Sequence, residues 1–552
     1  MATIRPQWSA MASIRPTPPG PFVRLATRVA SARLRLPPAT TGYRVDRDVA
    51  VSMRDGVDLL TDVYLPHVPH AEPAGTVLIR TPYGRTNLPA AVTAAVYAER
   101  GYQVVMQSVR GTFGSGGDFH PGYAESEDAA DTLTWLRDRP WFRGRLFTVG
   151  SSYLGYTQWA LLMDPPPELD TSVIGMAPHD FAETGWGTGA FALADFLTWS
   201  YQVATQEDGG TLRTVVRMVT MGRRLRRPLR IVPLRDAGAK ILKDRAPWHE
   251  SWLRTPDATD PYWRPARLGS ALQRTRTPVL LVTGWQDVFL TQTVEQYRRL
   301  RDGGAGPTLI VGPWTHGDGG GDVLRESLSW LAGERFDGVR VFVTGDGWRD
   351  LSSWPPPADA QRWYLSPRAA LTPQPVDGPP ARFVYDPADP TPTIGGRLLF
   401  APRGYREDSA LAARNDVITF TGAVLDRPVE VLGTPSVELA HRSDTGWCDV
   451  AVRISEVGAD GRSRNVSDGY VTRAPTDTGV LRLDLDPVAH RFAAGSRIRL
   501  SIAGGSYPRF ARNPGTGESV WTASRLVPTT HEIGMQSRLT LPVMNGCPVN
   551  GS

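Results

Sequence analysis

Short, continuous runs of apolar residues recur along the first part of the chain, and stretches with helical spacing separate several of them. A continuous run predicts a strand buried on both faces, because a half-exposed strand alternates apolar and polar residues. Buried strands that alternate with helices predict a parallel sheet with right-handed crossovers. The runs lie at residues 76–79, 102–106, 145–149, 171–176, 278–282 and 307–311.

Two other regions break this pattern and predict further domains. Between about residues 177 and 268, aromatic residues, arginines and helical spacing dominate, which indicates an inserted helical domain. Beyond residue 357, short alternating segments separated by Gly, Asp and Pro turns predict a β-sandwich of jelly-roll form. The expected division is a disordered Arg-rich leader at 1–42, an α/β core at 43–177 and 269–350, a helical cap at 178–268 and a jelly roll at 351–552.

Composition excludes several classes of protein. Apolar residues make up 41% and charged residues 21% of the 552 positions, as in ordinary globular proteins of more than one domain. Cys448 and Cys547 are the only cysteines, and no metal-ligand spacing is present, so neither a metal nor a cofactor is expected. The net charge of +5 comes almost wholly from arginine, with 56 acidic residues interspersed, which argues against nucleic-acid binding.

The amino-terminal segment is rich in arginine and carries no acid before Asp46. It lacks the apolar core of a secretory signal, and the near repeat of its opening at Met11 raises the question of a second start codon. No run of about 20 apolar residues occurs, so no transmembrane helix is expected. These absences predict a cytoplasmic protein.

A cluster of arginines lies within the expected cap. Between residues 209 and 235 the chain carries eight arginines and no acid. A solvated helix face is the more common explanation of such a run. An entrance for an anionic substrate and a docking surface for an acidic partner are the alternatives.

The segment Gly150-Ser-Ser-Tyr-Leu-Gly155 joins an expected strand to an expected helix. A nucleophilic serine needs a sharp turn of this kind, and Gly150 removes a Cβ that would clash there. Ser152 is the candidate nucleophile. A Gly- and Ser-rich turn without chemistry is equally compatible with these six residues, so other positions must decide.

Two later strands end in residues that a serine nucleophile requires. Asp287 follows one strand in a Gly-Trp turn, and His316 follows the next. A base must take the serine proton, and an acid must orient that base from the same edge of the sheet. A lone Asp after a strand is commonly a helix cap, and a lone His is commonly structural. The order Ser, Asp, His along the chain is that of α/β-hydrolases, which favours the catalytic interpretation.

Tyr83 follows the first buried strand of the expected parallel sheet, where α/β-hydrolases build half of the oxyanion hole. Its hydroxyl could donate to a developing oxyanion together with the backbone N–H of Tyr153. A turn tyrosine that packs on the sheet is the alternative.

Motifs spread along the chain from Val51 on resemble those of the hydrolases that include bacterial cocaine esterase, α-amino-acid ester hydrolases and Xaa-Pro dipeptidyl peptidases. The matching segments are 53–57 (Met-Arg-Asp-Gly-Val), 81–83 (Thr-Pro-Tyr), 109–119, 131–136 with Trp141, 150–155, 284–287 (Gly-Trp-Gln-Asp), 312–316 (Gly-Pro-Trp-Thr-His) and 507–517. The chain departs from the family at Ser108, where an Asp commonly precedes the Arg-Gly pair. This departure puts a supporting contact of Arg110 in question.

The resemblance implies an α/β-hydrolase core with an inserted helical cap and a carboxyl-terminal jelly roll. By this resemblance Ser152, Asp287 and His316 form the catalytic triad, with Tyr83 and the Tyr153 amide as the oxyanion hole. Phe289, Trp186 and Trp199 would form walls for the acyl group, although each tryptophan fits a core position equally well.

The sequence therefore predicts a serine hydrolase that cleaves an ester or amide carbonyl through an acyl-enzyme, with a carboxylic ester favoured. An Xaa-Pro dipeptidyl peptidase or an α-amino acyl hydrolase is the alternative, and would need an acidic anchor such as Glu183, Asp195 or Glu207. A non-catalytic protein that binds through its jelly roll is the rival from another class. The expected partner is a small ester, amide or short peptide, and a homo-oligomer is left open.

Overall fold

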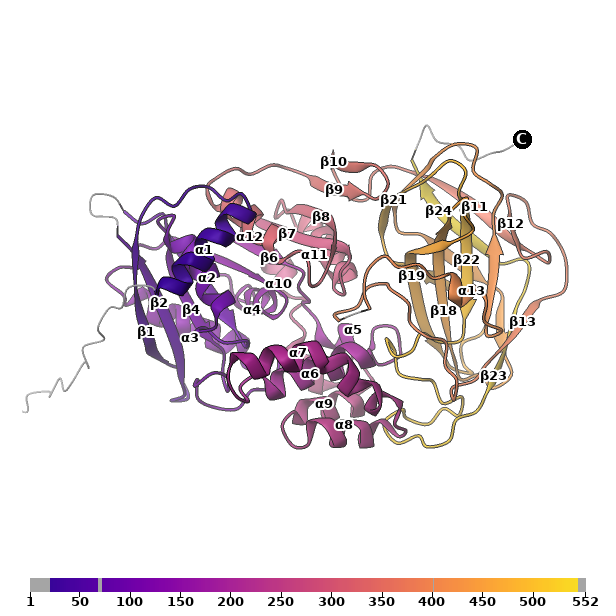
Figure 1. The fold of residues 1–552 in the computed structure, drawn as a ribbon, viewed down its shortest axis with the longest axis horizontal. Coiled ribbons are helices and arrows are strands. Elements are labelled where there is room, and N and C mark those ends of the chain that lie inside the picture. Colours follow the sequence, from indigo (N-terminus) through magenta and orange to yellow (C-terminus); the bar gives the residue numbers. More distant parts are fainter. Residues whose placement is uncertain (1–19, 68–71, 401, 545–552) are drawn as a thin grey trace, which may run out of the picture.

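The computed structural model describes residues 20–67, 72–400 and 402–544 (Figure 1). Its first part contains a ten-stranded sheet with the order β1-β2-β4-β3-β5-β6-β7-β8-β9-β10. The strands from β4 to β9 in this order run parallel, and antiparallel pairs lie at both edges. The bounds are β1 (Tyr43–Ser52), β2 (Asp58–Pro66), β3 (Thr76–Thr81), β4 (Gln103–Ser108), β5 (Leu146–Ser151), β6 (Leu169–Gly175), β7 (Val279–Gln286), β8 (Thr308–Thr315), β9 (Val339–Val343) and β10 (Gly347–Leu351).

Helices cover both faces of this sheet, which explains why its central strands are continuous apolar runs. Val77 and Ile79 of β3 face one core cluster, while Leu78 between them faces the other. The first cluster is covered by α1 (Pro21–Arg33), α2 (Leu88–Ala98) and α12 (Gly320–Leu331). The second is covered by α3 (Glu125–Arg137), α4 (Tyr153–Leu161), α10 (Ala271–Arg274) and α11 (Leu290–Asp302).

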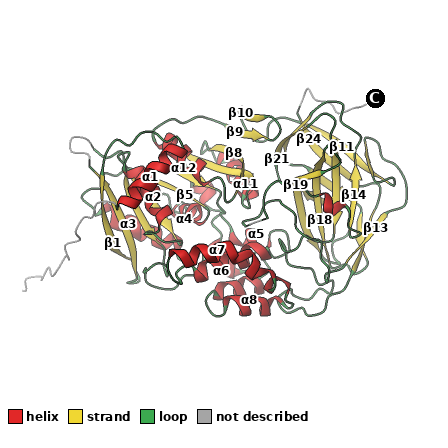
Figure 2. Cartoon of the chain, viewed as in Figure 1, coloured by secondary structure: helices red, strands yellow, loops and turns green. Residues whose placement is uncertain are grey.

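A group of helices is inserted in the chain between β6 and β7, which pair directly in the sheet, and lies beside the carboxyl edge of the sheet (Figure 2). Aromatic packing holds these helices together: Trp252 is fully buried and contacts the rings of Phe181, Phe196 and Trp263. The elements are α5 (Phe181–Trp186), α6 (Leu193–Thr205), α7 (Thr211–Arg226), η1 (Pro228–Arg230), α8 (Leu234–Leu242), α9 (Pro247–Arg254) and η2 (Pro261–Ala266).

In the rest of the described chain the regular elements are strands apart from α13, and long loops join several of them (Figure 2). The strands form an eleven-stranded sheet and a three-stranded sheet of order β13-β23-β17. The jelly-roll topology stays a prediction. The bounds are β11 (Asp359–Ser366), β12 (Ala370–Thr372), β13 (Ala381–Tyr385), α13 (Ser409–Ala412), β14 (Val417–Thr421), β15 (Val429–Gly433), β16 (Ser436–Leu439), β17 (His441–Ser443), β18 (Cys448–Val457), β19 (Ser463–Arg473), β20 (Leu481–Asp484), β21 (Val488–Phe492), β22 (Arg497–Ala503), β23 (Thr529–Ile533) and β24 (Arg538–Val543).

The expectation of disorder over residues 1–42 is wrong for part of this segment. Residues 1–19 lie outside the described residues, but α1 begins at Pro21 and packs against α2. Val23 and Leu36 contact the core cluster, and Thr27 is fully buried. The arginines that interrupt the apolar residues lie on the exposed side of α1, so they do not prevent the inner side from packing. Within the described parts of the chain, no helix has the length and apolar character needed to cross a membrane.

Candidate active site

Ser152 occupies a sharp turn between β5 and α4, at the carboxyl edge of the sheet. Its φ is 61° and its ψ is −128°, a conformation that is strained for a residue with a side chain. The two flanking glycines make this turn feasible. A Cβ at Gly150 would lie 2.5 Å from Leu154 Cβ, and one at Gly155 would lie 2.4 Å from Ala177 Cβ. The local sequence therefore fixes an exposed hydroxyl on a tight elbow.

A hydrogen-bonded chain links Ser152 to the ends of two neighbouring strands. His316 Nε2 lies 3.1 Å from Ser152 Oγ, and His316 Nδ1 lies 2.7 Å from Asp287 Oδ2. The carboxylate accepts from Nδ1–H, which leaves Nε2 free to accept from the serine hydroxyl. Asp287 is fully buried, and its second oxygen accepts from the Phe289 backbone N–H at 2.8 Å. The three residues that the sequence singled out therefore lie together.

Contacts from the strand-rich domain fix the loop that carries His316. Arg403 Nε donates to Thr315 Oγ1 at 2.8 Å, and the Thr315 hydroxyl donates to Asp318. Arg403 also donates to the Leu399 carbonyl at 3.0 Å. On the other side, the Phe289 ring packs edge-on against the imidazole with centroids 5.3 Å apart. The orientation of His316 therefore depends on residues from both large domains.

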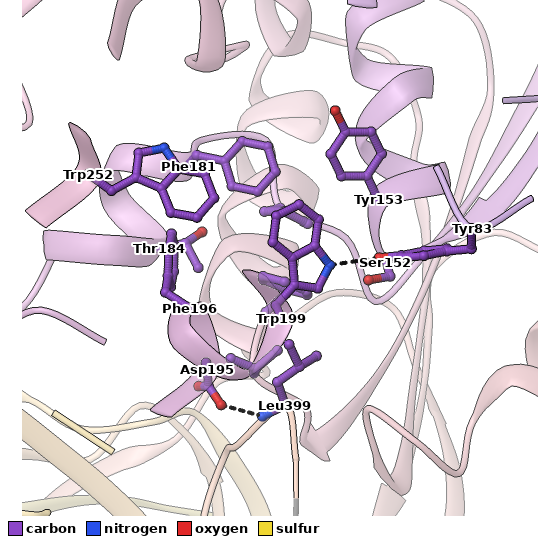
Figure 3. Close-up of a pocket in the computed structure, with 13 residues that line it drawn as sticks. Tyr83, Ser152, Tyr153, Phe181, Thr184, Asp195, Phe196, Trp199, Trp252 and Leu399 are labelled. Carbon is purple, nitrogen blue, oxygen red and sulfur yellow. Dashed lines mark hydrogen bonds between the residues drawn. The ribbon is translucent and has the colours of Figure 1, made fainter. Parts of the chain in front are cut away.

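The phenol of Tyr83 lies beside Ser152 (Figure 3). Trp199 Nε1 donates to the Tyr83 hydroxyl at 3.0 Å. Burial raises the pKa of Tyr83, and hydrogen bonds with Trp199 and Ser152 oppose this effect only in part. The hydroxyl therefore remains protonated at neutral pH and can donate. The hydrogen of the Tyr83 hydroxyl can then be donated to a substrate oxygen that takes the place of the Ser152 hydroxyl.

Tyr153 is the first residue of α4, so its N–H belongs to the helix end where donors lack intrahelical acceptors. Its side chain is held on both sides. The phenol donates to Glu125 at 2.9 Å and accepts from the Gly122 N–H at 3.0 Å, and the ring stacks on Trp199. This anchoring restricts the backbone that carries the N–H.

A narrow cavity of about 40 Å³ opens beside Ser152, and its exposed surface is almost wholly apolar. Phe289 and Trp199 line it, as expected. Trp186 does not, because its indole N–H donates to the Trp252 carbonyl at 2.9 Å and its ring packs on Phe191 inside the helical region. The complete lining is Tyr83, Ser152, Tyr153, Pro178, Phe181, Thr184, Asp195, Phe196, Trp199, Trp252, Val288, Phe289 and Leu399.

A wider cavity of about 540 Å³ adjoins the narrow one where the helices and the strand-rich domain meet. Thr184, Asp195, Val288 and Phe289 line both cavities. Charged side chains of both signs surround the wider one, whereas the narrow one has Asp195 as its single charged lining residue. A substrate would therefore pass through the wider, charged cavity before it reached the narrow, apolar one.

Two family models match the chain. One, described as X-Pro dipeptidyl-peptidase (S15 family), matches residues 55–318, and one described as X-Pro dipeptidyl-peptidase C-terminal non-catalytic domain matches residues 333–539. The chain belongs to this family of serine hydrolases. Cocaine esterase of Rhodococcus sp. (strain MB1 Bresler) is 29% identical over 544 residues, which cover 86% of this chain and 93% of that protein.

Solved structures of the family share the whole architecture. An α-amino acid ester hydrolase matches with a TM-score of 0.75 and 23% identity over 91% of this chain and 96% of that one. An aminopeptidase from a marine sediment archaeon, Thaumarchaeota archaeon, matches with a TM-score of 0.74 and 22% identity over 91% of this chain and 97% of that one. The predicted α/β-hydrolase architecture is confirmed, as is a serine hydrolase of ester or amide carbonyls.

The departure from the family at Ser108 does not leave Arg110 without support. Arg110 donates to Asp128 Oδ1 at 2.6 Å and to Asp55 Oδ2 at 2.6 Å. These hydrogen bonds raise the pKa of Arg110 despite its partial burial. Ser108 instead accepts from Arg85 at 3.3 Å. Two carboxylates from other segments thus hold the guanidinium.

One cluster in the strand-rich domain has metal-ligating residue types. Ligand atoms of His441, Cys448 and His531 lie within 4.8 Å of one another, and all three residues are buried. His441 Nε2 and His531 Nδ1 are hydrogen-bonded at 3.0 Å, and an Arg473 nitrogen lies 3.5 Å from His441 Nδ1. Burial raises the pKa of Cys448 to about 11. A neighbouring guanidinium and a protonated thiol both disfavour a bound cation.

Several lining residues escaped the sequence analysis. Phe181, Phe196 and Trp252 are helical aromatics whose spacing indicates burial but not which side faces a cavity. Leu399 comes from a segment of the strand-rich domain without regular periodicity. Asp195 was considered only as an anchor for an amino group. The four-residue spacing of Trp252 from Trp248, which does not line the cavity, indicates burial alone.

Proposed function

We propose that this protein is a carboxylic ester hydrolase in which Ser152 is the nucleophile, His316 the general base and acid, and Asp287 the residue that orients His316. The hydrogen-bonded chain from Asp287 through His316 to Ser152 carries this proposal, with distances of 2.7 and 3.1 Å. Both distances are within reach of direct proton transfer. A nucleophile at an elbow and a base fixed by a buried carboxylate together favour acyl transfer.

In this mechanism His316 Nε2 accepts the proton of the Ser152 hydroxyl as Oγ attacks the substrate carbonyl. Asp287 stabilises the imidazolium that forms. His316 then donates this proton to the leaving oxygen, which departs as an alcohol and leaves an acyl group on Ser152. A water molecule gives its proton to His316 and attacks the acyl-enzyme. Collapse of the second intermediate returns the proton to Ser152 and releases the acid.

The Tyr83 hydroxyl and the Tyr153 N–H are the proposed oxyanion donors. Tyr83 borders the reacting hydroxyl, and the Trp199 contact at 3.0 Å uses its acceptor lone pair and leaves its hydrogen free to donate. A donor aimed at the position where negative charge develops is worth roughly 3 kcal/mol in a site of this kind. The anchored ring of Tyr153 keeps the second donor in place.

Replacing Tyr83 with Phe should lower kcat about 100-fold and leave KM within a few-fold, because the lost donor acts on the transition state and not on the bound ester. Steady-state hydrolysis of p-nitrophenyl esters measures both constants. Tyr97→Phe is a matched control, since it also removes a buried phenol oxygen, bonded to Ser327 away from the site. A Tyr83→Phe variant with more than a third of parental kcat would remove Tyr83 from the oxyanion hole.

The shape of the narrow cavity supports an apolar acyl group of limited size. Its walls are aromatic, and its one charged lining residue, Asp195, is 6% exposed. The wider, charged cavity can hold a larger and more polar leaving group. We therefore propose esters with a short or flat apolar acyl group as the preferred substrates.

A panel of substrates tests this proposal. It contains p-nitrophenyl esters of graded acyl length, an Xaa-Pro anilide and a β-lactam with an α-amino acyl side chain, each compared by kcat/KM. We expect the short and aromatic acyl esters to exceed the Xaa-Pro anilide by about 100-fold or more, since an ester demands less protonation of its leaving group. Faster hydrolysis of the anilide would assign the chain to the peptidases instead.

An α-amino acyl substrate is the second candidate, because Asp195 supplies a carboxylate at the cavity. Burial raises the pKa of Asp195 to about 6, partly offset by the Leu399 N–H, which donates to it at 2.9 Å, and by Arg509. The carboxylate is therefore charged above this pH and could pair with an ammonium group. Glu183 lines only the wider cavity, and Glu207 lines neither. A preference for α-amino acyl substrates that weakens below pH 6 would favour this candidate.

A further inference from the structure

Helix α1 carries a stripe of large apolar side chains on its outer surface. Phe22 is 67% exposed, Leu25 60% and Val29 59%. Their spacing of three and four residues places them on one side of the helix. Isolated exposed apolar residues are common in proteins, but a continuous helical stripe is not. This surface needs an explanation beyond the fold.

The opposite side of α1 already provides its attachment to the core. Val23 packs against the core cluster, and Thr27 is buried with its hydroxyl donating to the Val23 carbonyl at 2.8 Å. After the helix, Arg100 from the end of α2 donates to the Pro37 carbonyl at 3.0 Å. The side of α1 that packs against the core is therefore a different side from the stripe. The exposed fractions of the stripe residues place them on the solvent side of α1, which packs against α2 (Figure 1).

Arginines flank the stripe on both sides. At 100° per residue, Arg28 lies along one border and Arg33 along the other, whereas Arg24 lies closer to the packing side. Among the described residues, none of the three has a carboxylate within 4.0 Å. Elsewhere, helix arginines are commonly paired, as in the contacts of Arg299 with Glu295 and of Arg325 with Asp322. Arg28 is attracted to Glu99 from beyond ion-pair distance, but no ion pair within the described residues occupies these guanidinium groups, so an external anion can bind them.

We propose that α1 binds to an anionic lipid surface. Phe22, Leu25 and Val29 would enter the boundary between headgroups and acyl chains, while Arg28 and Arg33 contact lipid phosphates. An amphipathic helix with arginines beside an apolar stripe has the composition that such surfaces bind. The helix lines neither of the two cavities at the active site, so the inference does not depend on the proposed function.

Charge argues against the two other ways of covering the stripe. A second copy of α1 packed on the first would bring arginines against arginines with no acid to neutralise them. The chain before α1 would do the same, since residues 1–19 include Arg5 and Arg15 and no acid. An anionic surface satisfies the apolar and the charged residues together.

Co-sedimentation with vesicles tests the proposal. Vesicles of phosphatidylcholine alone are compared with vesicles that contain about 30 mol% phosphatidylglycerol, at low and at physiological salt. We expect the parent protein to bind the anionic vesicles and to release with salt. The triple variant Phe22→Ser, Leu25→Ser, Val29→Ser should lose about tenfold or more in partition coefficient. The double variant Arg28→Gln, Arg33→Gln should lose about tenfold and show a weaker salt dependence.

The double variant Arg223→Gln, Arg226→Gln is the matched control, because both arginines are exposed at the carboxyl end of a different helix, α7. It removes the same charge and should bind within about twofold of the parent. Thermal unfolding of every variant verifies the fold independently of any enzyme assay. Parental binding that is absent, equal on both vesicles or lost equally in the control would overturn the proposal. So would a dimer that the triple variant abolishes in the absence of lipid.

Discussion

The variant Ser152→Ala is expected to retain less than about one ten-thousandth of parental kcat on p-nitrophenyl esters. Loss of the nucleophile removes the acyl-enzyme route, and only binding and the oxyanion donors would remain to accelerate attack by water. The fold should persist, because the Ser152 side chain does not cap α4 and its hydrogen bonds are with His316 and Tyr83 at the site. The measurement is kcat, together with labelling by an organophosphonate and mass mapping of the modified peptide.

Ser151→Ala is the matched control for this experiment. Ser151 is the adjacent residue at the end of β5, and its loss removes an identical hydroxyl one position away. It should keep kcat within a few-fold and retain phosphonate labelling. Turnover by Ser152→Ala equal to that of the parent would refute the nucleophile assignment and would leave the binding-protein interpretation in its place.

Asp287→Asn is the second change with a large expected effect, a decrease in kcat of about 1,000-fold to 10,000-fold near neutral pH. An amide at this position would donate to His316 Nδ1, which favours the tautomer with its proton on Nε2. That tautomer cannot accept the proton of Ser152. The backbone contact from Phe289 can persist, because an asparagine oxygen also accepts a hydrogen bond.

The control for Asp287→Asn is Asp322→Asn on α12, which removes one carboxylate paired with Arg325 on the protein surface. It should leave kcat within a factor of about two. KM for the ester should change little in either variant, since Asp287 lines neither cavity. A large increase in KM with unchanged kcat in Asp287→Asn would assign the residue to substrate binding instead of to the orientation of His316.

The ends of the core strands could be predicted from the sequence, and with them the meeting of Ser152, Asp287 and His316. Parallel strands bring their carboxyl ends to one edge, so residues just past those ends converge whatever the details of packing. The glycines at 150 and 155 also indicate the turn, because a crowded turn excludes residues that have a Cβ.

The cavity walls were harder to predict. Trp186 and Trp199 are both aromatic and both lie on helices of the cap region, yet one packs inside it and the other faces Ser152. Whether each ring faces the interior of the cap region or the cavity depends on how the helices pack on one another. A local sequence pattern does not specify this packing. Leu399 and Arg403 approach the site from a distant part of the chain, and no short segment records that contact. The sequence analysis did not predict helix α1, because arginines interrupt its apolar residues and the residues that pack inward are small.

Through the hydrogen bond from Arg403 to Thr315, the strand-rich domain helps to position the loop that carries His316. A truncated protein that ended after β10 would keep Ser152, Asp287 and His316. It would lack Arg403, which holds the loop of His316, and Leu399, which lines the narrow cavity. The domain named non-catalytic in the family therefore cannot be exchanged as an independent module. Attempts to alter substrate preference should therefore include Leu399 and Arg403 of the strand-rich domain as well as the cap residues.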